Sequence, residues 1–301
     1  MKWEGINEFV SVAETQSFTR SAKNLNISTA QVSRQISALE KRLNIKLFYR
    51  TTRSVSLTQE AHVFYQHCRS LLDGLDAAEQ AITNLQSSPQ GIIKLSLPIT
   101  YGEQKILPLI NNFITQYTGI EVICDLSNKR VDLIESGFDI AIRLGQLKDS
   151  SLIAKKLSER SNYVCASPQY LEKFGEPHTL SELKHHNCLL GTREYWRFND
   201  DGKEKHIRAR GNLRCNSGIG LVDAALKHIG IIQLPEYYVQ KYVDSGELIT
   251  LLDHLREPPE GIWAVYPQNR FLSPKIRLLI DFLFDSFHVN TTLKSENERY
   301  S

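Results

Sequence analysis

Several absences from this sequence exclude whole classes of protein. No stretch approaches the roughly 18 to 20 uninterrupted apolar residues that cross a membrane. The first residues carry acidic side chains where a signal peptide would be apolar, so we expect a cytoplasmic protein without a membrane partner. The five cysteines are far apart, and no Cys-x-x-Cys motif or Cys/His cluster indicates a metal site. We expect buried free thiols, with a redox pair of Cys188 and Cys215 as the alternative.

Catalytic and cofactor-binding motifs are missing as well. The chain contains no Gly-x-Ser-x-Gly, no P-loop, no His-Glu-x-x-His and no Gly-x-Gly-x-x-Gly after a strand. The pair His185-His186 is isolated beside Lys184, as in a solvated loop. We therefore expect no enzyme and no cofactor. An enzyme or solute carrier with an appended nucleic-acid module is a weaker alternative.

The charge of the chain is small overall but unevenly distributed. Of the 301 residues 41% are apolar, and the net charge is +2. Residues 1–58 hold nine Lys and Arg against four acids, residues 59–90 sum to −3, and residues 91–301 sum to zero. A basic N-terminal segment of this kind indicates a polyanionic partner.

The first 43 residues have the pattern of a helix-turn-helix. Apolar residues recur at helical spacing over residues 5–14, and Ser17 and Ser28 are N-cap candidates for a short second helix and a longer third one. In such a motif the last helix enters the major groove with its N-terminal turns. Gln binds adenine and Arg binds guanine in bidentate fashion. The residues expected to face DNA on this helix are Thr29, Ala30, Gln31, Ser33 and Arg34.

A wing and a long helix are predicted next. The segment "IKLFYRTTRSVSLT" (45–58) places β-prone residues on both sides of a basic tip, so Arg50 and Arg53 are expected to reach phosphate or the minor groove. After it, apolar residues alternate at steps of four and three, which is typical of a coiled-coil dimerisation helix. A long helix packed on its own domain is the alternative. The spacing runs through Leu57, Ala61, Phe64, Cys68, Leu71, Leu75, Ala78, Ile82 and Leu85.

Beyond the linker "SSPQG" (87–91), strand and helix patterns alternate, which indicates α/β units on a largely parallel sheet. A hairpin is expected around Tyr195–Phe198 and Lys205–Leu213. Several strands end in short polar turns that begin helices, and helix N-terminal amides attract anions. These turns are Pro98–Gly102, Ser127-Asn128 and Asn216–Gly218. A small carboxylate or similar molecule bound between two α/β lobes is the hypothesis, and simple helix caps are the alternative.

In this order, the elements resemble those of a LysR-type transcriptional regulator over roughly residues 3 to 288. The most specific part is "SFTRSAKNLNISTAQVSRQISALEKRLNIKLFYRTTRSVSLTQEA". "GFDIAIRLGQLKDSSLIAKKL" and "ASPQYLEKFGEP" are similar to the branch with virulence and aldehyde- or quinone-responsive regulators. Thr29-Ala30-Gln31 departs from the Gln-Pro-Ala that is frequent in the family, so no base preference is carried over.

The resemblance implies a fold, partners and site residues. The fold is an N-terminal winged helix-turn-helix (1–58), a linker and dimerisation helix (59–88) and an effector domain (91–289) similar to periplasmic solute-binding proteins. Its subdomains are 91–162 with 268–289, and 163–267; a polar tail (290–301) is expected to be disordered. The partners are an interrupted palindromic DNA operator, a small-molecule effector, further copies of the chain as a dimer or tetramer, and RNA polymerase. The effector residues are Thr100, Tyr101, Ser127, Asn128, Arg143, Asn216 and Ser217, and the dimerisation residues are Phe64, Leu71, Leu75, Ala78, Ile82 and Leu85.

The function expected from these patterns is that of a ligand-responsive, sequence-specific regulator. An inducer would shift the two lobes and thereby alter DNA bending by the tetramer. The alternative is a non-specific architectural DNA-binding protein, which requires only phosphate contacts.

Overall fold

The computed structural model describes residues 3–50, 54–83, 89–129, 132–147, 152–268 and 272–297. The chain forms two compact units. Unit 1 comprises Met1–Arg143, Asp149–Lys155 and Trp263–Ser301, and unit 2 comprises Leu144–Lys148 and Lys156–Ile262. The chain passes from unit 1 to unit 2 between Lys155 and Lys156 and returns between Ile262 and Trp263, whereas the expected subdomain boundaries were 162/163 and 267/268. The N-terminal helices and the first effector lobe therefore belong to the same unit.

Three helices form the N-terminal module, as predicted. They are α1 (Ile6–Thr15), α2 (Phe18–Asn24) and α3 (Thr29–Leu43). The hydroxyl of Ser17 accepts a hydrogen bond from the Arg20 amide at 3.3 Å, and that of Ser28 accepts one from the Gln31 amide at 3.2 Å, so both are N-caps. Helix α3 ends at Asn44, whose φ of 54° is left-handed.

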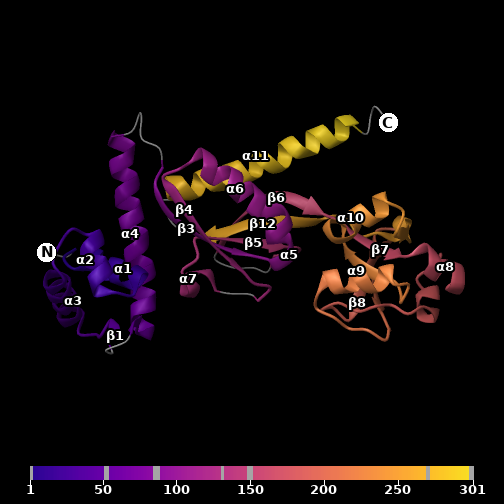
Figure 1. The fold of residues 1–301 in the computed structure, drawn as a ribbon, viewed down its shortest axis with the longest axis horizontal. Coiled ribbons are helices and arrows are strands. Elements are labelled where there is room, and N and C mark those ends of the chain that lie inside the picture. The colour runs from indigo at the N-terminus through magenta and orange to yellow at the C-terminus, as the bar shows by residue number, and fades with distance from the viewer. Residues whose placement is uncertain are drawn as a thin grey trace. The chain divides into compact units, whose positions relative to one another are not determined.

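A two-stranded wing follows α3. Strand β1 (Phe48–Arg50) pairs antiparallel with β2 (Val55–Leu57), and the tip between them lies outside the described residues. Apolar side chains from the helices and the wing form one core, in which Phe9, Val32, Ile36 and Leu39 have no exposed surface. In Figure 1, this module lies around the lower half of α4 (Gln59–Thr83).

A buried carboxylate joins α3 to the wing. The side chain of Glu40 is 5% exposed, and its Oε1 accepts hydrogen bonds from the Leu47 amide at 2.8 Å and the Phe48 amide at 3.4 Å. Its Oε2 lies 3.4 Å from both Lys46 Nζ and Arg50 Nη2. A buried charge is stable only with such partners, so Glu40 fixes the position of β1 against α3.

Helix α4 is attached to the wing by Thr58. The Thr58 hydroxyl donates to the Lys46 carbonyl at 2.8 Å and accepts from the Ala61 amide at 3.2 Å, so it caps α4 and holds the wing together. The first half of α4 then packs on its own module, because Ala61 and Cys68 are buried in the N-terminal core. The Phe64 ring lies 5.2 Å from that of Phe9. Phe64, which was expected at a dimer seam, packs on the core of its own module, in agreement with the alternative of a helix packed on its own domain for this half.

A five-stranded sheet with the order β4-β3-β5-β12-β6 follows the linker. Strand β3 (Gly91–Leu97) pairs in parallel with β4 (Ile120–Leu126) and with β5 (Ile140–Leu144), as predicted. The other two strands are β6 (Leu152–Arg160) and β12 (Glu260–Pro267). The helices of this part are α5 (Ile99–Tyr101), a π-helical turn (Gly102–Ile106), α6 (Leu107–Gln116), α7 (Leu133–Ser136) and α11 (Pro274–Asn297).

Unit 2 corrects the prediction of a largely parallel sheet. Here β7 (Asn162–Ala166) lies between β10 (Ile232–Pro235) and β11 (Ile249–Leu251), and both pairings are antiparallel. The expected hairpin is present as β8 (Tyr195–Asp200) and β9 (Lys203–Arg208), joined by Asp201-Gly202 with positive φ at both residues. The remaining elements are α8 (Pro168–Phe174), α9 (Gly218–Leu226), α10 (Glu236–Asp244) and 3₁₀ turns at Glu182–His185 and Asp253–Leu255.

The C-terminal segment differs from its prediction. Helix α11 continues to Asn297, so residues 290–297, which were expected to be disordered, are helical. Its apolar residues Leu279, Ile280 and Leu283 are buried, and this packing anchors the helix upstream. A polar composition does not stop a helix that is already nucleated, because propagation needs only one further hydrogen bond per residue.

Replacing Glu40 by Ala should separate the wing from α3. Two backbone amides would lose their acceptor in a buried position, which should cost about 2–5 kcal/mol of local stability. Hydrogen–deuterium exchange should therefore accelerate at residues 44–58. Lys46→Met removes an 82% exposed partner of the same carboxylate and should leave that exchange nearly unchanged. Equal protection in Glu40→Ala and the native protein would contradict this role.

Candidate nucleic-acid interface and effector site

Helix α3 presents the predicted DNA-facing residues to solvent. Thr29, Ala30, Gln31 and Arg34 are exposed and Ser33 is half-buried, while Val32 and Ile36 lie completely within the core. The buried stripe fixes the rotation of the helix, so the polar face is held outward before any ligand is bound. Amide and guanidinium groups held in this way can form bidentate hydrogen bonds with base edges.

Of the two wing arginines expected to contact DNA, the structure describes only Arg50. Arg50 is bound to Glu40, and its guanidinium carbon lies 4.7 Å from the centre of the Phe18 ring. A guanidinium engaged on both sides supports the wing. Arg53 lies outside the described residues.

The sequence analysis did not single out Tyr49, which is 63% exposed on β1 beside Arg50. Because side chains alternate along a strand, an inward Phe48 places the next residue outward, and this alternation is the sequence signal that would have found Tyr49.

Five predicted effector residues gather at one edge of the five-stranded sheet. Strands β3, β4 and β5 are adjacent and parallel, so the turns after them lie side by side. Asn128 Oδ1 accepts a hydrogen bond from the Ile99 amide at 3.1 Å, and the Ser127 amide donates to the Leu97 carbonyl at 2.8 Å. The residues brought together are Thr100, Tyr101, Ser127, Asn128 and Arg143.

The side chains of this group differ in their access to solvent. Asn128 is exposed, and Thr100, Ser127 and Arg143 are half-buried, whereas Tyr101 is only 3% exposed. Arg143 Nη1 donates to the hydroxyl of Ser96 at 3.4 Å. Ser96 is a completely buried residue that sequence reasoning missed, although a lone serine in the apolar strand "IIKLSL" is a detectable signal.

A glycine positions the loop that carries Thr100 and Tyr101. A Cβ atom on Gly102 would lie 2.9 Å from the Cβ of Leu97, too close for any side chain. The π-helical turn begins at this glycine, and such turns occur often at functional sites.

The other two predicted effector residues lie in unit 2. Asn216 and Ser217 are exposed and precede α9, and the hydroxyl of Ser217 accepts a hydrogen bond from the Gly220 amide at 3.3 Å. Ser217 is thus an N-cap, which is the plainer alternative that the sequence left open. The remaining free amides of the first turn of α9 are suited to an anion.

The cysteines are free thiols. Cys188 belongs to one apolar cluster of unit 2, and Cys215 packs on another. Burial raises the pKa of Cys188 to about 12, so its thiolate form is strongly disfavoured at neutral pH. The structure thus shows no Cys188–Cys215 pair.

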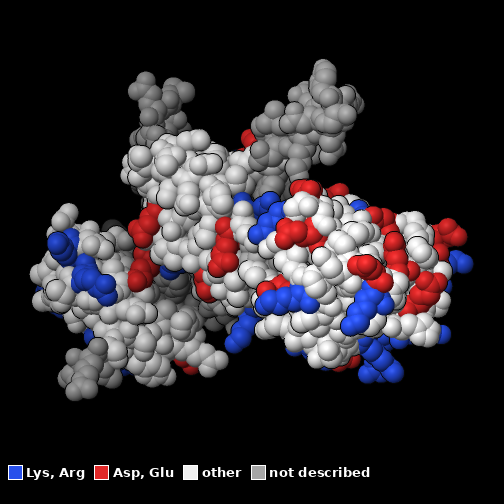
Figure 2. All heavy atoms as spheres, turned by 45° about the vertical axis from the view of Figure 1, so that its right-hand side comes forward, with Lys and Arg blue, Asp and Glu red and all other residues white. Residues whose placement is uncertain are grey.

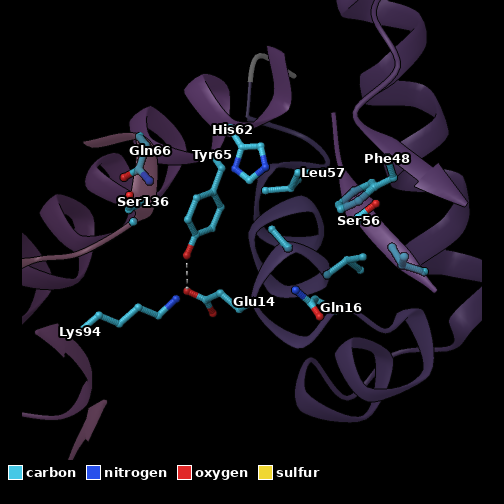
Figure 3. A pocket seen from close by; sticks show the side chains of 14 residues that line it. Glu14, Gln16, Phe48, Ser56, Leu57, His62, Tyr65, Gln66, Lys94 and Ser136 are labelled. Atoms are coloured by element: carbon cyan, nitrogen blue, oxygen red, sulfur yellow. Dashed lines mark hydrogen bonds between the residues drawn. The ribbon is translucent and has the colours of Figure 1, made fainter. Parts of the chain in front are cut away.

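A crevice of about 390 Å³ lies within unit 1 between the N-terminal module and the first effector lobe. Figure 3 shows its polar side chains: the Tyr65 hydroxyl on α4 donates to Glu14 on α1 at 3.1 Å, and Lys94 on β3 extends toward the same carboxylate. Arg69 Nη1 also lies 3.4 Å from Glu14. Burial, and then the Glu14 charge, raise the pKa of Tyr65. Gly137, after α7, approaches Gln66, so α4 contacts both the N-terminal module and the effector lobe.

The described part of the chain contains neither a metal-binding cluster nor a membrane-spanning helix. It holds no cluster of three or more His, Cys, Asp or Glu residues that could bind a metal ion. None of its helices has the length and apolar content needed to cross a bilayer.

Comparison with known proteins identifies the architecture. Residues 3–62 match the bacterial regulatory helix-turn-helix proteins of the lysR family, and residues 86–287 match the LysR substrate binding domain. The chain belongs to the LysR family. An uncharacterized HTH-type transcriptional regulator of Haemophilus influenzae is 35% identical over 279 residues, which cover 91% of this chain and 97% of the relative.

Solved LysR-type structures extend over nearly the whole chain. CrgA, a LysR-type transcriptional regulator of Neisseria meningitidis, is 30% identical with a TM-score of 0.60, and the match covers 94% of this chain and 98% of CrgA. The virulence activator AphB of Vibrio cholerae is 29% identical with a TM-score of 0.58, with 95% and 99% covered. The family consists of transcription regulators. This chain is accordingly a ligand-responsive DNA-binding regulator and not an enzyme, and the architectural alternative finds no support.

Arg34→Ala should weaken operator binding by about 1–3 kcal/mol if its guanidinium contacts a base. Binding to scrambled DNA should change much less, because a base contact contributes only at the matching sequence. Fluorescence anisotropy on both DNAs measures the difference. The matched control is Arg42→Ala, which removes the same charge from the other end of the exposed face of α3. An equal loss on both DNAs would make Arg34 a phosphate contact.

Proposed function

We propose that this LysR-family chain binds an interrupted palindromic operator through α3 and the wing, and responds to a small anionic effector. The observation that carries the proposal is the fixed exposure of Gln31 and Arg34 on a helix whose opposite face is fully buried. The base-contacting set is Thr29, Ala30, Gln31, Ser33 and Arg34. Arg50 supports the wing through Glu40, and Arg53 contacts phosphate.

The effector binds at the polar turns that follow the strands. Asn128 and Thr100 supply hydrogen-bonding groups at one edge of the sheet of unit 1, together with Ser127 and Arg143. Tyr101 is buried, so it shapes this loop and does not contact the effector directly. In unit 2, Asn216 and Ser217 form a second polar turn of this kind, at the N-terminal amides of α9, which attract negative charge.

Oligomers form through the second half of α4. Leu71 and Leu75 are 50% and 55% exposed, on a helix whose first half packs on its own module through Ala61, Phe64 and Cys68. Burying such side chains contributes about 1.5–3 kcal/mol each. The proposed seam also includes Ala78, Ile82 and Leu85; the side chains of the first two and the whole of Leu85 lie outside the described part of the structure. The protein acts in the cytoplasm as a dimer or tetramer, with RNA polymerase as a further partner.

The first experiment is fluorescence anisotropy of the full chain on DNA from upstream of its own gene, because LysR-type regulators often control their own promoters. Scrambled DNA of equal length serves as the control over a salt series. A preference of at least about 100-fold for the upstream DNA is expected, since specific sites exceed non-specific ones by about 10³ or more. Equal binding to both DNAs with a steep salt dependence would contradict sequence-specific binding at this promoter.

Leu75→Glu should dissociate the oligomer, because it would bury a carboxylate at the seam. Sedimentation velocity should show a smaller species, and operator affinity should fall because two half-sites are no longer bound together. Val63→Glu alters a 58% exposed residue closer to the start of α4 and is the matched control. An unchanged sedimentation profile for Leu75→Glu would remove this residue from the interface.

A further inference from the structure

Unit 2 contains a cluster of charged side chains that the proposed function does not use. Its members come from the end of β6, from β8 and the loop before it, and from the region where β12 begins. Over the face shown in Figure 2, blue and red side chains are interspersed across unit 2, so no large area of one sign indicates a binding surface. The local arrangement is more informative. The cluster consists of Arg160, Arg193, Arg197, Glu257 and Glu260.

Two of the arginines form ion pairs with the two carboxylates. Oε2 of Glu260 accepts hydrogen bonds from Arg160 Nε at 3.2 Å and Nη2 at 2.8 Å. Oε1 of Glu260 accepts one from Arg197 Nη2, and Arg197 Nε lies 3.2 Å from Glu257 Oε1. The side chains of these four residues are between 7% and 15% exposed. Hydrogen-bonded pairs in such positions are held rigidly.

Arg193 is held differently. Its Nη2 lies 3.7 Å from Glu260 Oε1, beyond hydrogen-bond distance, and its side chain is 56% exposed. Three guanidinium groups face the two carboxylates, and the exposed Glu204 also acts on Arg197 and Glu257. Partial burial, and then the neighbouring Arg197, lower the pKa of Arg193. An anion at the exposed side of Arg193 would stabilise the guanidinium cation that these surroundings disfavour.

The loop that carries Arg193 lies beside predicted effector residues. Leu190 forms a β-bridge with Arg214, and its carbonyl accepts a hydrogen bond from the Cys215 amide at 2.8 Å. Glu194 Oε1 accepts one from Arg214 Nη1 at 3.0 Å. The segments 190–194 and 214–217 are thus joined at several points, and the second of them contains Asn216 and Ser217.

We propose that Arg193 binds an oxyanion of the effector, either a carboxylate or a phosphate, and thereby selects anionic effectors over neutral ones. The proposal rests on the proposed function and names the chemistry of its effector. Arg160 and Arg197 are positioning residues here, because they hold the carboxylates that keep Arg193 at the rim. A planar guanidinium with several parallel N–H donors matches both anions.

The test uses the full chain and three small probes: acetate, inorganic phosphate and, as the uncharged counterpart of acetate, acetamide. Binding is measured as the rise in the melting temperature of the protein when the probe is added, compared with the same protein in chloride at equal ionic strength. Acetate or phosphate should stabilise the native protein, and acetamide should not. Arg193→Gln should raise the dissociation constant at least about tenfold, since hydrogen bonds to charged groups are the strong ones. Arg193→Lys, which retains the charge without the fork, should lose less.

Arg208→Gln is the matched control, because it removes one exposed arginine of the same unit from β9 and should bind the anion as the native protein does. A response to acetate alone assigns a carboxylate, and a response to phosphate alone assigns a phosphate. Equal losses in Arg193→Gln and Arg208→Gln, or no response of the native protein to either anion, would overturn the proposal. Operator binding is measured in parallel for every variant. Its retention without an anion response refutes this inference alone, whereas failure of the native protein to prefer its operator refutes the proposed function.

Discussion

The carboxylate of Glu40 is the interaction on which the DNA-binding module depends. A single buried side chain on α3 accepts from two amides of the wing and lies against two basic side chains. Its removal would leave these donors buried without an acceptor. The helix and the wing are therefore held in a fixed position relative to each other. Arg50, which the sequence assigned to DNA, contributes to this by pairing with Glu40.

Helix α4 connects the DNA-binding module to the first effector lobe. Thr58 ties its first turn to the wing, and Tyr65 ties its next turns to α1 through Glu14. At the same turn, α4 also meets the segment after α7, where Gly137 approaches Gln66. The predicted effector turn at Ser127 and Asn128 precedes α7 in the chain. A ligand that shifts that turn would thus act on a helix already in contact with the DNA-binding module, provided that it binds the two states with different affinity.

Charge is used differently in the two units. The winged-helix segment carries an excess of basic residues that suits a polyanion, whereas unit 2 concentrates three arginines around two buried carboxylates. In the first case the charges face solvent broadly. In the second, most of the charge is neutralised internally, and only Arg193 reaches the rim. Long-range attraction suits a large ligand, and a single placed guanidinium suits a small one.

Local sequence patterns alone determined the helices of the DNA-binding module, their N-caps at Ser17 and Ser28, and the outward face of α3, because capping and helical periodicity depend on residues within a few positions. The polar turns after β3 and β4 followed from the same kind of signal. Only the tertiary structure decided that Phe64 packs inward while Leu75 stays exposed, since heptad spacing specifies which residues share a helix face but not what covers it. It also decided the antiparallel sheet of unit 2, the role of Arg50, and the cluster around Glu260, whose members lie up to 100 residues apart in the chain. Such contacts leave no local pattern, because each residue is ordinary among its own neighbours.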